Sequence, residues 1–237
     1  MKIDEHITGK IKNARKGFAL TGAGISAPSG IPTFRGPNGF WKDKDPFSPK
    51  SFRENPQLVW HWHEEMREMM RKAKPNPAHY ALTEIQNSFD DFAIITQNID
   101  NLHQEAGSKN VIELHGNIYR NKCNECGKKF GEIRSGEIPK CDECGGLIRP
   151  DVVWYGEIIP LYALQKAREL VEDCEICLII GTSGMVQPAA SFPLLARENG
   201  AYTLEINKEE TVITNYLDDS LFGDVSEILP ELSKTLL

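Results

Sequence analysis

Residues 19–36 read ALTGAGISAPSGIPTFRG, a stretch that joins the end of an apolar strand to a glycine-bearing turn and so decides the fold. Gly22, Gly24 and Gly30 allow the backbone to turn sharply and to approach a phosphate without interference from a Cβ atom. Ala27 stands where the dinucleotide-binding fingerprint has its third glycine. The turn by itself therefore gives only weak support for nucleotide binding.

Short apolar runs bounded by turn residues recur along the chain. They are rich in branched residues, as buried parallel strands are, and they lie at residues 17–22, 92–98, 110–116, 175–182 and 201–207. Helical patterns alternate with these runs, at residues 76–89, 161–174 and 188–200. The alternation predicts an α/β fold with a Rossmann-like, doubly wound parallel sheet, whose ligand lies at the carboxyl ends of the strands.

Two segments depart from this alternation. Residues 37–75 hold a turn-rich entry and then a helical pattern, while residues 120–150 are polar, glycine-bearing and cysteine-paired. We predict that the two segments form a smaller domain, made of a helical insertion and a cysteine module. The Rossmann-like domain then consists of residues 1–36, 76–119 and 151–237.

The bulk composition is that of a globular protein, with 237 residues, 40% of them hydrophobic and 26% charged. A formal net charge of −7 argues against a general affinity for nucleic acid. No uninterrupted apolar stretch has the length of a membrane span, and residues 1–17 form a charged amphipathic pattern rather than a signal peptide. We expect a cytoplasmic monomer that binds no membrane and no nucleic acid.

Six cysteines fall in three C-x-x-C pairs, and two of these pairs lie in the polar segment 120–150. Four thiolates in two such pairs suit a tetrahedral zinc ion and leave no open coordination position, so the site should be structural. Four unligated or redox-active thiols are the alternative, which we disfavour because the segment has few apolar residues with which to fold without a metal. The expected ligands are Cys123, Cys126, Cys141 and Cys144.

The third cysteine pair has the same spacing but a different setting. Cys174 and Cys177 enter a predicted buried strand, where two residues three apart point to opposite faces. We therefore interpret them as core cysteines rather than metal ligands.

Polar side chains follow the second and third predicted strands. Gln97, Asn98, Asp100 and His103 come after the second strand, and His115 comes after the third. A histidine near an asparagine and an aspartate is a candidate general base, because its ordinary pKa lies near neutrality and a carboxylate can fix its tautomer. Taken alone, a histidine such as His115 is more often structural than catalytic, and the sequence offers no matched nucleophile such as a G-x-S-x-G elbow.

Read together, these pieces resemble the sirtuins, the NAD-dependent protein lysine deacylases, and in particular their small prokaryotic-type members. The matching stretches occur in family order and are TGAGISAPSGIPTFRG, PNPAHYAL, TQNIDNLHQEAG, ELHGN, the paired C-x-x-C knuckles, RPDVVWYGE, GTSGMVQPAA and EIN. They span most of residues 17–227. The combination is far more specific than any single element.

The resemblance implies that NAD is the cofactor and that one zinc ion is structural. In the family, the first glycine turn holds the pyrophosphate, and a loop that begins near Thr33 closes over the nicotinamide. The residues that the resemblance assigns to NAD are Gly22, Ala23, Ser26, Thr33, Phe34, Arg35, Gln97, Asn98, Ile99, Asp100, His115, Gly181, Thr182, Ser183, Asn207 and Val225.

The resemblance also implies a catalytic role for three of these residues, His115, Asn98 and Asp100. The acyl-lysine carbonyl oxygen attacks the anomeric carbon as nicotinamide leaves. His115 then deprotonates a ribose hydroxyl, which attacks the resulting alkylamidate, while Asn98 and Asp100 order the ribose and a bound water. The products are nicotinamide, free lysine and 2′-O-acyl-ADP-ribose.

The implied partner is an acyl-lysine peptide or protein, which the family binds as an added strand. Residues 152–157 resemble the strand with which the family pairs its peptide, opposite residues 184–186. The residues assigned to the peptide are therefore Val152, Val153, Trp154, Tyr155, Gly156 and Glu157 on one side, and Gly184, Met185 and Val186 on the other.

Acyl selectivity is expected to depend on the helix of the small domain. Sirtuins that prefer acidic acyl groups carry a tyrosine and an arginine there, and this chain has His63 and Met66 at those positions. We therefore expect acetyl or longer uncharged acyl groups to be favoured over succinyl. A protonated His63 could attract a carboxylate, but a packing histidine is the preferred interpretation. The aromatic and methionine residues of this helix are likewise interpreted as core rather than as an acyl-binding box.

Two other functions remain open at this point. A protein mono-ADP-ribosyltransferase would use the same fold and the same cofactor residues but a different acceptor. A non-enzymatic zinc-ribbon module that binds nucleic acid or a partner protein is the second alternative. The acidic total charge and the lack of a basic stripe around the cysteines argue against this module.

Overall fold

The computed structural model of the chain describes residues 3–33 and 47–236. The larger domain is built on a six-stranded sheet with the order β3-β2-β1-β7-β8-β9, in which every neighbouring pair is parallel. Its strands are β1 (Lys16–Thr21), β2 (Asp91–Thr96), β3 (Val111–Glu113), β7 (Ile176–Ile180), β8 (Tyr202–Asn207) and β9 (Asp219–Phe222). The chain extends the sheet first to one side of β1 and later to the other, so the predicted doubly wound fold is confirmed.

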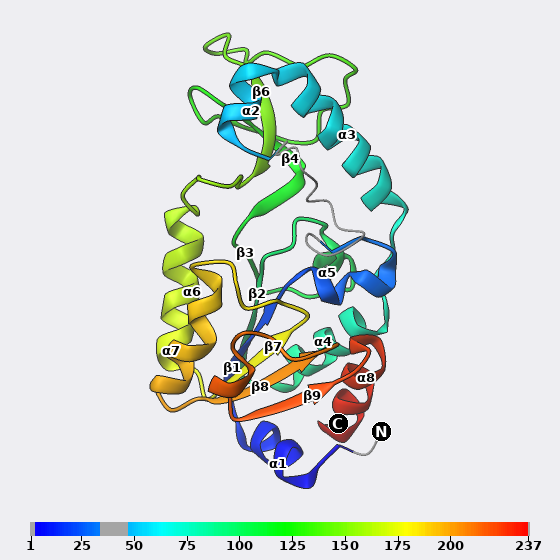
Figure 1. Cartoon of the computed structure of the whole chain (residues 1–237), viewed down its shortest axis with the longest axis vertical. Coiled ribbons are helices and arrows are strands. Elements are labelled where there is room, and N and C mark those ends of the chain that lie inside the picture. Colours follow the sequence, from blue (N-terminus) through cyan, green and yellow to red (C-terminus); the bar gives the residue numbers. More distant parts are fainter. Residues whose placement is uncertain (1–2, 34–46, 237) are drawn as a thin grey trace.

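Helices cover both faces of this sheet (Figure 1). One face carries α1 (Glu5–Asn13), α4 (Pro77–Ser88) and α8 (Val225–Leu236), and the other carries α6 (Leu161–Asp173) and α7 (Phe192–Glu198). Successive strand residues point to opposite faces, so that Ala19 packs under the first set of helices while Phe18 and Leu20 pack under the second. Coverage on both faces explains why these strands are apolar throughout rather than alternating.

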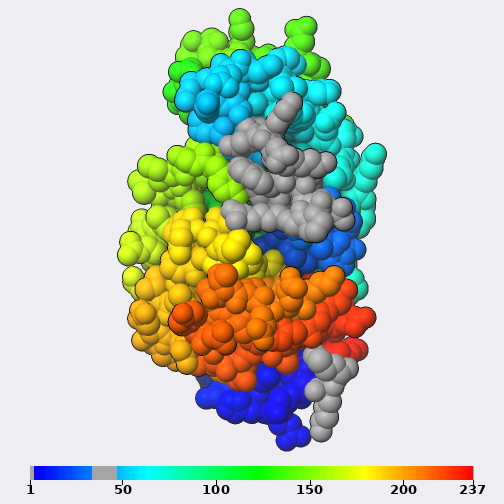
Figure 2. All heavy atoms as spheres, viewed as in Figure 1, coloured from blue at the N-terminus to red at the C-terminus, as the bar shows by residue number. Residues whose placement is uncertain are grey.

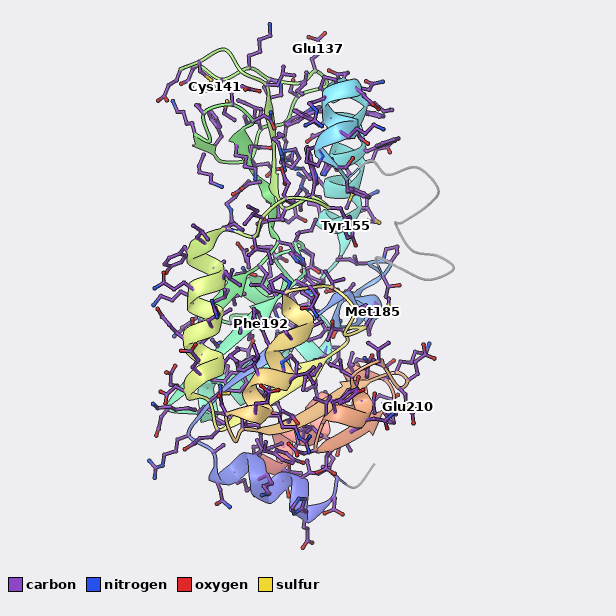
Figure 3. All side chains as sticks on the ribbon, turned by 60° about the vertical axis from the view of Figure 1, so that its left-hand side comes forward. Glu137, Cys141, Tyr155, Met185, Phe192 and Glu210 are labelled. Carbon is purple, nitrogen blue, oxygen red and sulfur yellow. The ribbon has the colours of Figure 1, made fainter. Side chains whose placement is uncertain are left out.

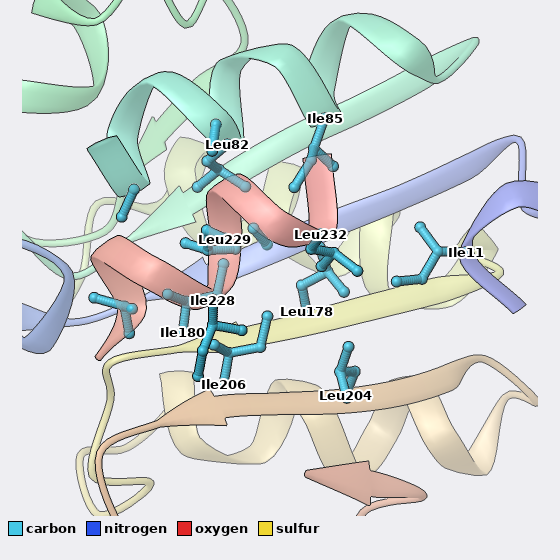
Figure 4. Packing of buried hydrophobic residues seen from close by; sticks show 14 of the residues in the cluster. Ile11, Leu82, Ile85, Leu178, Ile180, Leu204, Ile206, Ile228, Leu229 and Leu232 are labelled. Carbon is cyan, nitrogen blue, oxygen red and sulfur yellow. The ribbon is translucent and has the colours of Figure 1, made fainter. Parts of the chain in front are cut away.

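The core beneath α4 and α8 is continuous with the sheet (Figure 4). Leu82 of α4, Leu229 of α8 and Leu178 of β7 are all fully buried in it. Burial of one such side chain stabilises the fold by about 1.5–3 kcal/mol. Helix α8 continues through Pro230, which lies inside its span.

The smaller domain lies at one end of the long axis (Figures 1 and 2). It combines α2 (Pro49–Glu54) and α3 (Pro56–Lys72) with an antiparallel sheet of order β5-β4-β6, formed by β4 (Gly116–Cys123), β5 (Lys129–Phe130) and β6 (Ile148–Val152). Helix α3 begins after Asn55, whose side-chain oxygen accepts a hydrogen bond from Leu58 N at 3.1 Å. Strand β4 crosses the boundary that we predicted after residue 119, and β6 crosses the one after residue 150.

Three features differ from the sequence expectations. Strand β9 was not predicted, because its run Asp219–Phe222 is short and half polar. Strand β6 ends at Val152, so residues 153–157 follow it as irregular structure. The expected opposite orientation of Cys174 and Cys177 is wrong, because Cys174 precedes β7 and packs against the same apolar cluster that buries Cys177.

Among the described residues, no helix has the length and apolar character needed to cross a membrane.

Candidate active site and metal centre

The turns that follow β1 and β7 pack directly against each other. Gly24 N donates a hydrogen bond to Gly181 O at 2.8 Å, and Gly22 N donates to Ile180 O at 3.0 Å. A Cβ atom on Gly24 would lie 2.7 Å from Gly181 Cα, and Gly181 itself has φ +59°. The glycines are therefore needed for close approach of two backbones, which brings the carboxyl ends of β1 and β7 together.

Asn98, Ser26 and Asp100 form a hydrogen-bonded group beside these turns. Asn98 Nδ2 donates to Gly22 O at 3.1 Å and to Ser26 Oγ at 3.2 Å. Ser26 Oγ in turn donates to Asp100 Oδ2 at 2.6 Å. Burial raises the pKa of Asp100, although its hydrogen bonds with Ser26 and Leu102 N act in the opposite direction. The group fixes the amide of Asn98 at the junction of β1 and β2.

A second layer of polar groups lies behind Asn98. Thr21 Oγ1 donates to Thr96 Oγ1 at 2.8 Å, and Asn98 N donates to the same Thr96 oxygen at 3.0 Å. His103 Nε2 lies 2.9 Å from Thr21 Oγ1, and burial, together with the charge of nearby His79, lowers the pKa of His103 to about 3. His103 therefore supports the strand ends as a buried neutral ring.

Unlike the buried ring of His103, the ring of His115 has a nitrogen that remains available for chemistry. Its Nδ1 lies 2.9 Å from Gln97 O, and because a carbonyl only accepts, Nδ1 carries the proton. Within the described residues Nε2 has no hydrogen-bond partner, and it keeps its lone pair. Burial lowers the pKa of His115, although the bond to Gln97 raises it in part, so the ring is neutral near pH 7. A neutral imidazole with a free Nε2 can accept a proton.

The remaining residues assigned to NAD divide by location. Gln97 Nε2 donates to Thr182 Oγ1 at 2.9 Å, and Asn207 Nδ2 donates to Thr182 O at 2.8 Å, which links the ends of β2, β7 and β8. Ser183 is exposed in the same turn, whereas Val225 is buried in the core under α8. The others lie at the start of the β1 turn (Ala23), against the small-domain core (Ile99), at the end of a described segment (Thr33) or outside the described residues (Phe34 and Arg35).

Neither Thr21 nor Thr96 was singled out from the sequence, although both close the hydrogen-bonded layer behind Asn98. The local signal is only that each is the last residue of a strand, and the two become register partners when β1 and β2 pair.

The segments assigned to the peptide follow β6 and β7. Val153 N donates to the backbone oxygen of His115 at 2.9 Å, so the first segment is tied to the candidate base. Tyr155 and Met185 are 36% and 47% exposed, and Figure 3 shows them one above the other on the same side of the molecule. Gly184 has φ +66° and Val186 is half-buried, and both belong to the loop that carries Met185.

His63 and Met66 are both buried in the small domain. His63 Nδ1 lies 2.7 Å from Val59 O, and its Nε2 accepts a hydrogen bond from Trp154 Nε1 at 3.2 Å. Burial lowers the pKa of His63 to about 4, with a smaller contribution from the charges of Arg67 and Arg149. The packing interpretation of His63 agrees with these contacts.

The other large residues of α3 are also packed. Trp60 belongs to the cluster around Cys123 and Cys141, while Met66 and Met70 belong to the cluster around Trp154. The expectation of core packing is confirmed for Trp60, Met66 and Met70, whereas Met69 is a partly buried neighbour of the second cluster and Trp62 is only half-buried.

The four predicted zinc ligands lie together at the far end of the small domain. Their sulfur atoms all lie within 4.8 Å of one another, with 3.4 Å between Cys123 and Cys144 and 3.7 Å between Cys126 and Cys141. A tetrahedral zinc ion with Zn–S bonds of about 2.3 Å needs sulfur atoms about 3.8 Å apart, so the residues fit the metal. Gly127 and Gly145 have φ +74° and +73° and close equivalent turns after each pair. The site is a structural zinc ribbon that involves four of the six cysteines.

Two surface hollows of about 540 and 440 Å³ lie at the opposite, amino-terminal ends of the strands. The first contains Arg197, which pairs with Asp218, and the second contains Lys16, which pairs with Asp173. We place the candidate active site at the carboxyl ends instead, because the hydrogen-bonded polar groups converge there.

A family model and the sequences of known relatives assign the chain to the same family. Residues 22–188 match the model of the Sir2 family. A protein of Aquifex aeolicus named "NAD-dependent protein deacylase" is 52% identical over 205 residues, which cover 84% of this chain and 86% of that protein. A protein of the same name from Pyrococcus abyssi is 45% identical over 94% of this chain and 93% of its own length.

Solved structures agree with the sequence relatives. One described as a Sir2 homologue–NAD complex superimposes with a TM-score of 0.93 and 41% identity, and covers 99% of this chain and 94% of that one. Another, described as "Sir2-p53 peptide-NAD+", gives a TM-score of 0.90 and 37% identity, and covers 99% of this chain and 98% of that one.

Proposed function

Because the chain belongs to the Sir2 family and is an NAD-dependent protein deacylase, we propose that it moves the acyl group of N6-acyl-lysine onto ADP-ribose, in a reaction that consumes one water molecule. The products are nicotinamide, free lysine and 2′-O-acyl-ADP-ribose. The observation that carries this proposal is the neutral His115, whose free Nε2 lies at the strand ends where Asn98, Ser26 and Asp100 also meet.

NAD contributes a sugar carbon with nicotinamide as its leaving group, together with the hydroxyl groups of that sugar. His115 accepts the proton of a ribose hydroxyl at Nε2, and its bond to Gln97 O keeps the ring in the tautomer that can do so. As the ring gains this proton, the same carbonyl stabilises the positive charge on the imidazole. A general base of this kind contributes about 10²–10⁴-fold to the rate.

Asn98 and Asp100 orient the sugar in the proposed mechanism. The amide of Asn98 is held from two sides, by Gly22 O and by Ser26 Oγ, so its oxygen has a defined direction. Asp100 accepts a hydrogen bond from Ser26 Oγ, which in turn accepts one from Asn98 Nδ2. Positioning by preformed hydrogen bonds lowers the entropic cost of reaching the reactive geometry.

We assign different parts of the dinucleotide to residues at the ends of different strands. We assign the pyrophosphate to the backbone of the turn at Gly22 and Ala23, which Gly22 allows to pack closely against Gly181 and Thr182. We assign the distal ribose to Asn207, which is fixed by its bond to Thr182 O. The peptide is assigned to residues 152–157 and 184–186 as an added strand, so that backbone hydrogen bonds provide affinity for many sequences.

The acyl preference follows from the small-domain residues near the peptide segment. His63 is neutral and both of its ring nitrogens are engaged, while Met66 contributes only an apolar side chain. Arg67 points to β4, where its guanidinium donates to Ile118 O and Asn121 Oδ1 at 2.6 Å each. Among the described residues of this region, a succinyl carboxylate would therefore be buried without a free cationic partner, which is costly. Acetyl and longer uncharged groups are favoured.

Acyl selectivity is tested with acetyl, hexanoyl and succinyl forms of one peptide, by measuring kcat/KM for each at saturating NAD. We expect kcat/KM for the succinyl form to be lower than for the acetyl form by about tenfold or more. A tenfold difference corresponds to roughly 1.4 kcal/mol. The same measurement at a higher salt concentration serves as a control. Salt would weaken an effect of distant surface charges on the succinyl peptide, but it would not weaken the effect of a local contact. A succinyl form that is turned over faster than the acetyl form would refute this preference.

A further inference from the structure

The indole ring of Trp154 is enclosed by three different parts of the small domain. Its ring centroid lies 3.3 Å from the guanidinium carbon of Arg149, 5.3 Å from the Phe52 ring and 5.7 Å from the His63 ring. The side chain is only 3% exposed. Trp154 is therefore held by α2, α3 and β6 together, although it lies in irregular structure after β6.

The hydrogen bond between Trp154 and His63 requires one particular state of the histidine. An indole N–H can only donate, so His63 Nε2 must accept and carry no proton. The other nitrogen, Nδ1, lies 2.7 Å from Val59 O and must therefore be the protonated one. The neutral Nδ1–H tautomer satisfies both contacts. In a doubly protonated ring, the Nε2–H group would face the indole N–H group, and this hydrogen bond would be lost. His63 thus connects the backbone of α3 to the indole of Trp154.

An ion pair fixes the backbone on the other side of the indole. Arg149 Nη1 and Nη2 donate to the two Glu157 carboxylate oxygens at 2.5 and 2.8 Å, and Nη2 also donates to Val152 O at 2.7 Å. Glu157 Oε2 accepts in addition from Trp154 N at 2.9 Å. Burial raises the pKa of Glu157, but these hydrogen bonds outweigh it, so the pKa is lowered and the carboxylate is ionised. The turn at residues 154–157 is thereby closed.

This arrangement also sets the distance between residues 153–155 and the candidate base, His115. Val153 N donates to the backbone oxygen of His115, and Tyr155 N donates to Phe47 O, at 2.9 and 3.0 Å. Trp154 lies between these two donors, so whatever fixes its side chain also fixes the backbone on both sides.

We propose that His63 is a positioning residue for the peptide substrate, which acts through Trp154 to hold residues 152–157 in the shape that receives an added strand. This inference rests on the proposed function in one respect, the assignment of residues 152–157 to the peptide. It gives His63 a role that does not depend on the acyl group, since the imidazole is directed at the indole rather than at a carboxylate.

The test compares three variants of the full, zinc-loaded chain. His63→Phe removes the acceptor and leaves the indole N–H buried without a partner, while His63→Gln supplies an amide oxygen as a substitute acceptor. His61→Phe is the matched control, because His61 lies on the same helix with a side chain that is 63% exposed and lies beside Glu65.

Two readouts are measured. The first is hydrogen exchange of the amides in residues 148–157, which needs no catalytic activity. We expect exchange to accelerate about tenfold in His63→Phe, because losing the partner of a buried donor costs on the order of a tenfold change in an equilibrium constant. Amides of β1 and β2 should keep their protection, and His63→Gln should restore most of the protection in residues 148–157.

The second readout separates binding from chemistry. In His63→Phe, KM for an acetyl-peptide should rise about tenfold, while kcat and the dissociation constant for NAD change less than about twofold. Unchanged exchange in residues 148–157, or equal losses in His61→Phe, would overturn the proposal. A wild-type chain that releases no nicotinamide with any acyl-peptide would instead refute the proposed function, and the exchange measurement would still decide whether His63 holds the segment.

Discussion

The Nδ1 atom of His115 lies 2.9 Å from the carbonyl oxygen of Gln97, and this contact leaves Nε2 as the basic atom of the ring. Replacing the residue, as in His115→Ala, removes the base and should lower kcat/KM about 10²–10⁴-fold. Zinc content and the urea midpoint should stay close to wild type, because the ring packs only partly into the core. Steady-state kinetics with an acetyl-peptide provide the measurement, and His61→Ala is the control. A variant with normal turnover would exclude His115 as the base.

The pH profile of activity should reflect the burial of His115. Burial lowers the pKa of this imidazole below its ordinary value of 6.5, so the basic form persists to lower pH than in a free histidine. We expect kcat/KM to be constant from pH 8 to about pH 6.5 and to fall by about tenfold per unit below the lowered pKa. Initial rates from pH 5 to 8 provide the check. A decline already centred above pH 7 would show that the ring is not shielded in this way.

The zinc site should be essential to the small domain. Cys141→Ser leaves three thiolates, so zinc affinity falls and the β5-β4-β6 sheet loses the ion that joins its loops. Metal analysis and circular dichroism of the purified variant measure this. Cys174→Ser is the matched control, because that thiol packs against the core of the large domain and lies outside the metal cluster. Equal zinc loss in both variants would contradict the assignment.

The contact between the β1 and β7 turns should tolerate no side chain at Gly24. A Cβ atom there would lie 2.7 Å from both Gly181 Cα and Gly181 O, so Gly24→Ala should destabilise the chain by about 1–3 kcal/mol. Gly9→Ala should instead stabilise it by about 0.5–1 kcal/mol, since Gly9 lies inside α1 and a Cβ atom added there would meet nothing within 4 Å. Urea denaturation at pH 7.5 measures both. The two variants should shift the urea midpoint in opposite directions. Equal midpoints would show that the two turns do not pack against each other in this way.

The buried His63 should make stability depend on pH in a defined window. Its folded-state pKa of about 4 lies below the ordinary 6.5, so between these values the unfolded chain binds a proton that the folded chain does not. The stability conferred by neutral His63 is thus complete above pH 6.5 and is lost as the pH falls towards 4.

Comparison with His63→Gln isolates this effect, because the zinc ligands titrate equally in both proteins. The unfolding free energy of wild type should fall relative to that of the variant by about 1.4 kcal/mol per pH unit below pH 6.5. Urea titrations at pH 7.5, 6 and 5 supply the values. A difference that stays constant across this range would show that His63 is not buried in its neutral form.

Much of the site could be predicted from sequence because strand ends are marked locally. Asn98 and His115 each lie two residues after the end of an apolar strand, and the carboxyl ends of parallel strands lie at one edge of the sheet. The zinc ligands could be predicted for a similar reason, since C-x-x-C spacing itself fixes two sulfur atoms on one turn.

Other features could not be read from local patterns. The role of His63 depends on Trp154, which lies 91 residues further along the chain. The layer behind Asn98 depends on Thr21 and Thr96, which meet only when β1 and β2 are in register. Strand β9 is weakly marked because half of its residues are polar. Such contacts are set by tertiary packing. The spacing of residues within one segment of the sequence does not reveal them.

The most direct test of the proposed acyl transfer follows the fate of NAD labelled in its adenosine part, with and without an acetyl-lysine peptide. If the chain transfers the acyl group to ADP-ribose, nicotinamide release requires the peptide, deacetylated peptide forms in equal amount, and the label appears in 2′-O-acetyl-ADP-ribose. Label attached covalently to protein, with the acetyl group still on the peptide, would contradict the account and identify the chain as an ADP-ribosyltransferase.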